Sequence, residues 1–126
     1  IKFILKCDDS LIINCDKLQL TQVFNNIIQN SMNSILENNI LNGVIDIDVY
    51  KNNTRVIVQV KDNGVGIVNS KSELIEPYFS TRKKTGGTGL GLSIVNKIIT
   101  DHDGILELKN NSDNGLCVKI TFNKSI

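Results

Sequence analysis

The hydrophobic positions of this chain repeat with two different periods, and the changes between them predict its elements. Alternating or short continuous apolar runs, typical of strands, are expected over 2–6, 10–14, 44–50, 54–62, 105–110 and 116–122. Two longer stretches carry apolar residues at helical spacing, one from Asp16 to about Asn39 and one from about Thr88 to before Asp103. Asp16 is a suitable N-cap for the first helix. The last two strands predict a hairpin across 112–115.

This order predicts the fold class. Strands that follow one another in pairs favour a mixed, mostly antiparallel sheet, and amphipathic helices need an apolar surface to cover. We therefore expect an α/β fold, a two-layer α/β sandwich with about three helices on one face of the sheet. The third would be a short helix over 70–76, within a loop region over 63–87. A loop of this length inside a small domain is typical of a lid or binding loop.

Length and charge narrow the function classes. The 126 residues suit a single domain over 1–126, and the net charge of +1 provides no overall field for nucleic acid or an anionic membrane. Any anion site must therefore be local. Three cysteines without metal-ligand spacing indicate reduced thiols and a cytosolic location. No apolar run reaches the ~18 residues of a membrane span. Because the chain opens directly in a strand, we interpret it as a piece of a longer chain, and a membrane-anchored parent is compatible with this.

The first helix carries a row of asparagines. We expect Leu20, Phe24, Ile27, Ile28, Ser31 and Ile35 to cover the sheet. Asn26, Asn30 and Asn33 follow at i, i+4 and i+7, in a stripe roughly opposite that face, which Gln22 and Glu37 extend. A solvated polar face is the ordinary interpretation. Asparagine is a poor helix former, however, so three at this spacing lower the helix propensity. Its amide oxygen is a neutral ligand, suited to Mg²⁺ whose charge is already balanced by phosphates.

A short turn motif follows the strand that ends at Asp62. In "DNGVGI", Gly64 and Gly66 remove side chains, so a flat ligand can approach the backbone, and Ile67 can supply an apolar wall. We expect the Asp62 carboxylate to point out of the sheet edge and to accept hydrogen bonds, for example from the exocyclic amine of adenine. An ordinary Asp-Asn-Gly turn is the alternative.

A basic, glycine-rich segment precedes the second helix. "TRKKTGGTGLGL" matches neither a Walker A loop nor a Rossmann fingerprint. It places Arg82, Lys83 and Lys84 before the amides of a helix N-terminus, an arrangement that suits a triphosphate. A surface loop with ordinary cations is the alternative. We expect 68–87 to be mobile without nucleotide and partly ordered with it.

The three motifs occur in one order, and that order resembles a known family. "TQVFNNIIQNSMNSI", "DNGVGI" and "EPYFSTRKKTGGTGLGLSIVNKIITDHDG" resemble the N box, first glycine box, F box and second glycine box of the catalytic and ATP-binding domain of bacterial sensor histidine kinases (Bergerat fold, GHKL superfamily). The similarity covers about 11–122 and is greatest to the nitrogen-regulation (NtrY/NtrB-like) group. Two departures are Ser31 in place of the usual Ala and "DHDG" in place of the frequent "HGG".

The resemblance implies ATP and Mg²⁺ as cofactors and a role for each matching residue. Asn30 would be the Mg²⁺ ligand, with Asn26 near the phosphates; both would serve catalysis. Asn33, at a position where many relatives carry a Lys or an acidic residue, would also belong to the nucleotide-binding residues. Asp62 would bind the adenine amine. The remaining implied nucleotide-binding residues are Gly64, Gly66, Ile67, Tyr78, Phe79, Arg82, Lys83, Gly87, Thr88, Gly89, Leu90, Gly91 and Leu92. His102, the only histidine, falls at the end of the last helix, where we expect a partly buried structural role.

The resemblance also implies a mechanism and partners. Such a domain supplies the γ-phosphoryl group to a histidine on the protein's own helical dimerisation domain, which this sequence lacks, and a response regulator acts downstream. The isolated domain would then be monomeric and unable to phosphorylate itself, with no nucleic acid or membrane contact. Gyrase, MutL and Hsp90-type ATPases carry a water-activating Glu four residues before the Asn30 position, where this chain has Asn26. An anti-sigma-factor serine kinase and a non-catalytic nucleotide-binding module remain alternatives.

Overall fold

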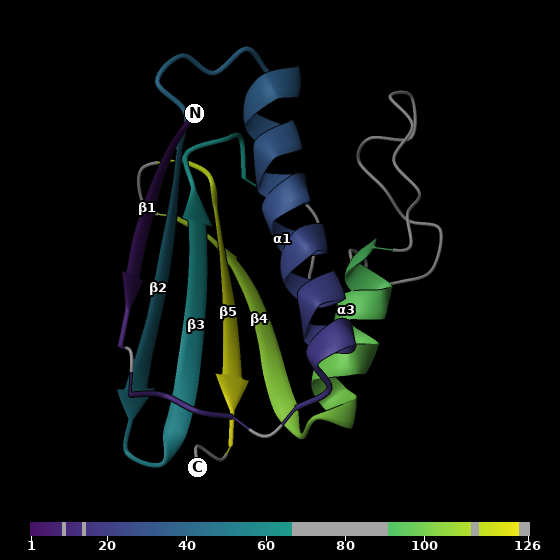
Figure 1. Ribbon diagram of the computed structural model, residues 1–126. Helices are drawn as coiled ribbons and strands as arrows, with labels where there is room; N and C mark the ends of the chain where they lie inside the picture. The colour runs from purple at the N-terminus through teal and green to yellow at the C-terminus, as the bar shows by residue number, and fades with distance from the viewer. Residues whose placement is uncertain (9, 14, 67–90, 112–113, 124–126) are drawn as a thin grey trace.

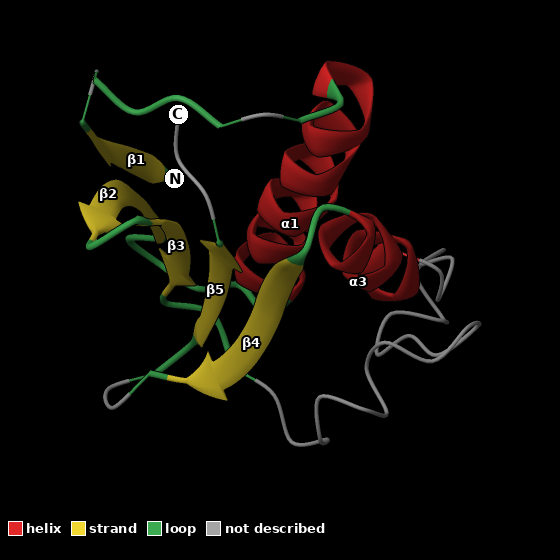
Figure 2. Ribbon diagram, turned by 90° about the horizontal axis from the view of Figure 1, so that it is seen from below, coloured by secondary structure: helices red, strands yellow, loops and turns green. Residues whose placement is uncertain are grey.

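The structure, a computed structural model, describes residues 1–8, 10–13, 15–66, 91–111 and 114–123. In this part of the chain, a five-stranded sheet carries two helices side by side on one face (Figure 1, Figure 2). The elements are β1 (Lys2–Cys7), α1 (Lys17–Glu37), β2 (Val44–Asn52), β3 (Arg55–Asp62), α3 (Gly91–Asp101), β4 (Gly104–Asn110) and β5 (Leu116–Phe122). The predicted two-layer α/β sandwich is confirmed; the short helix expected over 70–76 lies outside the described residues.

The strand order is β1-β2-β3-β5-β4, with β1 parallel to β2 and the other three pairs antiparallel. The mixed, mostly antiparallel sheet is therefore confirmed. Lys61 pairs with Cys117, so the end of β3 and the start of β5 lie side by side at one edge of the sheet. This register brings Asp62, the last residue of β3, next to the β4–β5 turn. The predicted β4–β5 hairpin is present, and β2 and β3 also pair as antiparallel neighbours.

Helix α1 begins where the sequence predicts. The Asp16 carboxylate oxygen Oδ1 accepts a hydrogen bond from the backbone N–H of Gln19 at 3.1 Å, which satisfies one of the free donors of the first turn. The helix ends at Glu37, two residues earlier than expected, and Asn39 then adopts a left-handed conformation with φ of 53°. The next strand begins at Val44, after Gly43, where a side chain would collide with Ile35.

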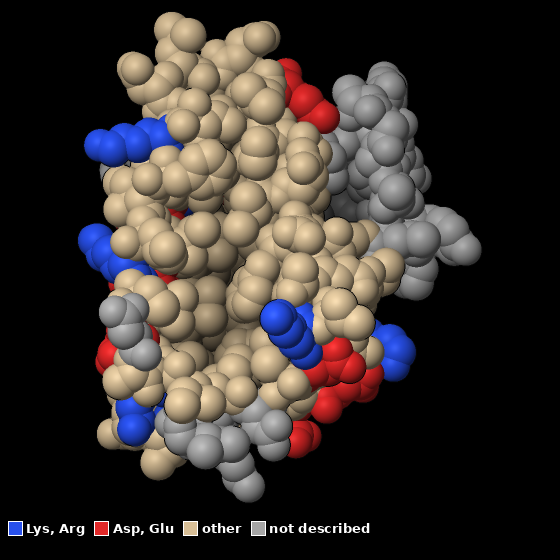
Figure 3. All heavy atoms as spheres, in the orientation of Figure 1, with Lys and Arg blue, Asp and Glu red and all other residues tan. Residues whose placement is uncertain are grey.

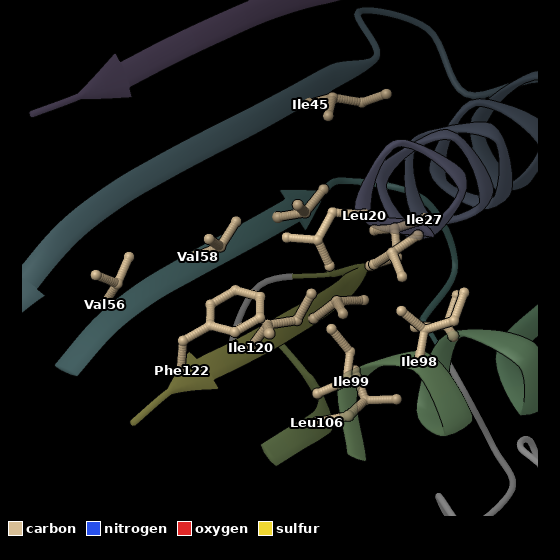
Figure 4. Packing of buried hydrophobic residues seen from close by; sticks show 14 of the residues in the cluster. Leu20, Ile27, Ile45, Val56, Val58, Ile98, Ile99, Leu106, Ile120 and Phe122 are labelled. Carbon is tan, nitrogen blue, oxygen red and sulfur yellow. The ribbon is translucent and has the colours of Figure 1, made fainter. Parts of the chain in front are cut away.

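The core lies between the sheet and the helices (Figure 4). Helix α1 contributes Leu20, Val23, Ile27, Ser31 and Ile35 to the buried face. Val23 is completely buried although the sequence analysis did not assign it to this face, and Phe24 is only partly buried against the cluster. From the sheet, Val58, Val60 and Ile120 pack toward the helices. Each fully buried aliphatic side chain of this kind contributes about 1.5–3 kcal/mol.

The strand predicted over 10–14 is absent from its described residues, 10–13. Leu11 and Ile13 pack against the core, whereas Ile12 is exposed. The apolar alternation therefore reflects the burial of every second side chain. A segment that crosses the end of the sandwich shows this pattern without pairing to a strand. This segment connects β1 to α1 (Figure 1).

The end of α3 is joined to the start of α1 by His102. The ring Nδ1 lies 2.8 Å from the carbonyl oxygen of Ile98, to which it donates, and Nε2 accepts from the backbone N–H of Asp16 at 3.0 Å. These partners require the neutral tautomer with the proton on Nδ1. The ring is half-buried. The structural role expected for His102 is therefore present, and it couples two elements that are distant in the sequence.

Charged side chains of both signs occur on the face of the molecule that Figure 3 shows. In Figure 3, Lys and Arg residues are interspersed with Asp and Glu residues at the margins of the face in view, around a centre free of charge. An exposed ion pair between Lys97 and Asp101 lies on α3. In the part of the chain that the structure describes, no helix is both long and apolar enough to cross a bilayer.

Candidate functional site

Asp62 occupies the end of β3, next to the turn that the sequence analysis singled out. Its side chain is buried, with 4% of the residue exposed. The carboxylate oxygen Oδ1 accepts two backbone hydrogen bonds, from Gly64 at 2.9 Å and from Leu116 at 3.2 Å. The expectation that Asp62 points out of the sheet edge is wrong. Positions 58, 60 and 62 of a strand lie on the same face of the sheet. The Asp62 side chain therefore faces the helix layer, as those of Val58 and Val60 do.

The second carboxylate oxygen of Asp62, Oδ2, has a different environment. No described residue donates a hydrogen bond to it. Asp62 therefore presents one oxygen fixed by two backbone donors and a second oxygen that receives no donor from the described residues. A carboxylate held in this way is a directional hydrogen-bond acceptor.

Helix α1 and the start of β2 hold the turn that follows Asp62. The Ser34 hydroxyl accepts a hydrogen bond from the backbone N–H of Val65 at 3.3 Å. Asn63 accepts from the backbone N–H of Val44 at 2.8 Å and donates to the carbonyl of Asn42 at 2.9 Å. The turn is thus connected to a helix and to a neighbouring strand, which restricts its movement relative to Asp62.

The two turn glycines are required by close contacts. A Cβ atom on Gly64 would collide with the Ser34 hydroxyl, and one on Gly66 would meet the side chain of Asn110. Gly66 also has φ of 77°, in the left-handed region that favours glycine. Both glycines therefore allow the turn to lie directly against α1 and the β4–β5 hairpin. The expected role, close approach of a ligand to the backbone, would add to this packing role.

The asparagine stripe lies beside the buried face of α1. Asn26, Asn30 and Asn33 are half-buried, whereas Asn25 and Gln29 are exposed. The expectation of a stripe opposite the core face is wrong, because a rotation of ~100° per residue places Asn30 only ~60° from Ile27. The amide oxygen Oδ1 of Asn33 accepts a hydrogen bond from Gln29 at 2.9 Å, so part of its capacity is used within the helix.

Other predicted residues divide into two groups. Gly91 and Leu92 form the first turn of α3 as described, and no described atom lies within 4 Å of where a Cβ on Gly91 would be. Amides at such a helix N-terminus attract anions. The predicted site residues that lie outside the described part of the chain are Ile67, Tyr78, Phe79, Arg82, Lys83, Gly87, Thr88, Gly89 and Leu90.

The structure brings the predicted turn and the stripe-bearing helix together. Ser34, which contacts the turn, follows Asn33 directly, and Asn30 lies one turn earlier on α1, ~6 Å along the axis. The residues that fix this arrangement were not predicted from the sequence: Ser34, Asn63, Asn111, Gly115 and Leu116. Turn propensity was the only local signal for Asn63 and Gly115.

An open cleft of about 480 Å³ borders the same turn. Its lining residues are Ile40, Asn63, Gly64, Val65 and Asn114. They do not include Asp62 or any member of the asparagine stripe. The cleft therefore shares Gly64 with the predicted nucleotide site but none of its carboxylate or asparagine side chains, and we assign it no ligand.

The described residues contain no cluster of three or more His, Cys, Asp or Glu side chains that could hold a metal ion. A divalent cation could still bind through neutral amide oxygens, provided that the ligand supplies the negative charge. Asn26 and Asn30 fit this role by residue type. A phosphate-bearing ligand is therefore the kind of partner that suits these side chains.

Comparisons with known proteins agree with this fold and site. Residues 15–126 match the family described as "Histidine kinase-, DNA gyrase B-, and HSP90-like ATPase". The catalytic domain of histidine kinase ThkA superposes with a TM-score of 0.80 at 32% identity, covering 98% of this chain and 78% of that one. The fold and the turn thus define a class of ATP-binding domains.

The chain belongs to this family as an ATP-binding domain of the sensor histidine kinase type. It is 38% identical to sporulation kinase A of Bacillus subtilis (strain 168) over 117 residues, which are 92% of this chain and 18% of that protein. A putative sensor histidine kinase, NtrY-like, from Rickettsia bellii (strain RML369-C) is 33% identical over 119 residues, 91% of this chain and 18% of that protein. The chain therefore spans about a fifth of the length of these curated relatives.

Proposed function

We propose that residues 1–126 form one domain that binds Mg·ATP and supplies its γ-phosphoryl group to a histidine on another domain of a two-component sensor kinase. One observation carries the proposal. The buried Asp62 carboxylate is fixed through Oδ1 by two backbone donors, and no described residue donates a hydrogen bond to its Oδ2. The exocyclic amine of adenine is a donor suited to this oxygen.

The asparagines of α1 would serve the phosphate end of the nucleotide. With its base at Asp62, a nucleotide would extend along α1 from Ser34 toward Asn30 and Asn26. In this arrangement Asn30 would hold magnesium, Asn26 would contact the phosphates, and Asn33 would lie nearest the base. When bound, magnesium would offset phosphate charge. The protein's part in phosphoryl transfer is then positioning and electrostatic stabilisation.

The remaining nucleotide contacts are proposed for the first turn of α3 and the segment before it. The amides of Gly91 and Leu92 are oriented by an 11-residue helix, which favours negative charge at its start. For the residues at 67–90 that the family resemblance implies, the proposal rests on the sequence motif alone. We likewise infer a helical phosphoacceptor domain and a response regulator as partners, a cytosolic location and a monomeric state for the isolated domain.

Asn30 tests the metal assignment. In a titration with a fluorescent ATP analogue, Mg²⁺ should tighten binding to the parent, and Asn30→Ala should remove most of that effect. Asn25→Ala is the matched control, because Asn25 lies on the same helix but is exposed, and both substitutions raise helix propensity equally. Equal Mg²⁺ dependence in Asn30→Ala and the parent would exclude Asn30 as the ligand.

A phosphotransfer role requires an acceptor outside this chain. The only histidine is His102, and both of its ring nitrogens are engaged in hydrogen bonds. The isolated domain should therefore bind ATP without acquiring stable label from γ-labelled ATP, and stable labelling of this chain alone would refute the proposal. A dedicated hydrolase is the second candidate. Steady ATP hydrolysis that is lost in Asn26→Ala would favour it. The nitrogen-regulation subgroup stays a prediction from the sequence.

A further inference from the structure

The turn between β4 and β5 contacts Asp62 through both its backbone and its side chain. The side-chain amide of Asn111 donates from Nδ2 to the backbone carbonyl of Asp62 at 3.0 Å and to that of Leu116 at 3.4 Å. The backbone N–H of Leu116 donates to the Asp62 carboxylate. Residues 49 and 54 positions away in the sequence therefore determine how Asp62 is held.

Close packing makes this contact specific. Gly115 has φ of 97°, and a Cβ atom there would overlap the carbonyl oxygen of Asp62. The backbone N–H of Asn111 donates to the Gly115 carbonyl at 2.9 Å, which closes the turn next to the same oxygen. Asn111 is half-buried. The Asn111 amide thus connects the end of β3 to the start of β5, where the backbone N–H of Leu116 donates to the Asp62 carboxylate.

We propose that Asn111 is a positioning residue for the nucleotide base, acting through Asp62 without touching the ligand. This inference rests on the function proposed above. Without the Asn111 amide, the Asp62 carbonyl loses its side-chain donor, and the hairpin is no longer held at the distance that lets Leu116 fix Oδ1. The carboxylate can then rotate, and Oδ2 no longer faces the base in a single direction.

The measurable consequence is selectivity between purines. A directed carboxylate accepts from a 6-amino group but faces the carbonyl of a 6-oxo purine as a second acceptor, which leaves both groups unpaired. Inosine triphosphate, which carries this carbonyl, should therefore bind the parent more weakly than ATP. If Asn111 orients the carboxylate, its loss should weaken ATP binding much more than inosine triphosphate binding.

A merely structural role for Asn111 predicts something different. Loss of a hydrogen bond that only stabilises the hairpin should lower the melting temperature and leave the ratio of the two affinities unchanged. Asn123 provides a matched control. Its side chain donates to the carbonyl of Asp103 at 2.6 Å, so Asn123→Ala removes the same kind of bond at the opposite end of the same hairpin.

The experiment is a calorimetric titration of ATP and inosine triphosphate into the parent, Asn111→Ala, Asn111→Asp and Asn123→Ala, with melting temperatures recorded in parallel. We expect Asn111→Ala to weaken ATP binding by about 5–10-fold, the equivalent of roughly one hydrogen bond, and to reduce the preference for ATP by at least about threefold. Asn111→Asp, of similar shape but without the donor, should reduce the preference at least as much. Asn123→Ala should leave it unchanged.

The outcomes separate the two proposals. A parent that binds neither nucleotide refutes the proposed function, and the inference with it. A parent that prefers ATP, with the same preference retained in both Asn111 variants, refutes only the positioning role. If Asn111→Ala does not fold, Asn111→Asp decides the matter, because it keeps the shape of the side chain and removes the donor. A reduced preference in a folded Asn111→Asp protein supports positioning, and a parental preference contradicts it.

Discussion

Substitution of Gly64 by alanine tests the contact between the turn after β3 and helix α1. The added methyl group would overlap the Ser34 hydroxyl, lie 3.0 Å from the Ser34 Cβ and 3.1 Å from the Asp62 Oδ1. The Ser34 Cβ is attached directly to the helix backbone, and the Asp62 Oδ1 is held by two backbone donors, so neither can move aside freely. The turn must therefore move away from the helix, and the hydrogen bonds to Asp62 and from Val65 lengthen with it.

The expected cost follows from overpacking. Insertion of one methyl group into a closely packed site destabilises by about 1–3 kcal/mol. For a chain of 126 residues this corresponds to a fall in melting temperature of roughly 4–11 °C. Nucleotide affinity should fall as well, because the displaced turn includes the amide that fixes the Asp62 carboxylate.

The partner substitution Ser34→Gly makes the test specific. Alone it should cost about 1–2 kcal/mol, from helix propensity and the hydrogen bond lost by the Val65 amide. It also removes both Ser34 atoms that the new methyl group would meet. The double variant should therefore be about as stable as Ser34→Gly alone, which gives a favourable coupling of about 1–3 kcal/mol in a double-mutant cycle. Differential scanning calorimetry measures all four proteins.

Two results would refute this reasoning. The first is a Gly64→Ala protein as stable as the parent. The second is simple addition of the two costs in the double variant, since additive costs mean that the residues do not touch. Gly91→Ala is the control for glycine removal as such. No described atom lies near its Cβ position, so stability should remain unchanged or rise with helix propensity.

Three further substitutions and probes follow from the same contacts. Gly115→Ala should lower the melting temperature at least as much as Gly64→Ala, because φ of 97° is strained for alanine and the methyl group would overlap the backbone of Asp62. A Gly115→Ala protein as stable as the parent would contradict the described turn. His102→Ala should lower the free energy of unfolding by about 1–2 kcal/mol in a urea titration, because the backbone N–H of Asp16 loses its acceptor. An unchanged midpoint would show that the bridge between α1 and α3 contributes nothing to stability. Burial raises the pKa of the Cys117 thiol, so at neutral pH a thiol reagent should modify the exposed Cys7 and Cys15 rapidly and Cys117 only on unfolding. Equally fast labelling of all three cysteines would refute the burial of Cys117.

The sequence predicted most elements because their signals are local. The Asp16 cap, the alternation along β2 and β3 and the asparagine-glycine turn between β4 and β5 each depend on neighbouring residues. Where the prediction was wrong, burial and pairing had been confused. Ile12 lies between two partly buried neighbours in a segment without a partner strand. Strand order was not predictable either, since hairpin signals do not state that β5 pairs with β3.

The candidate site was predictable only in part for the same reason. Asp62, Gly64 and Gly66 form a motif of adjacent residues, so the sequence could single them out. Ser34 and Asn111 act on that motif from positions 31 and 49 residues away. No periodicity or turn propensity connects such residues. Their roles become apparent only once α1 and the β4–β5 hairpin have packed around the end of β3.

This long-range construction ties nucleotide binding to folding. The hydrogen bonds that fix Asp62 join β3 to its own turn and to β5, and Ser34 connects that turn to α1, so the carboxylate is directed only in the assembled sandwich. A ligand that binds the folded state alone stabilises it by about 2.7 kcal/mol at a hundredfold excess over Kd. For this domain that is roughly the destabilisation expected from Gly64→Ala. Saturating ATP should therefore raise the melting temperature of the parent by as much as the substitution lowers it, and should raise that of Gly64→Ala by less, because its turn no longer fixes Asp62. An equal rise in both proteins would mean that base recognition does not depend on this turn.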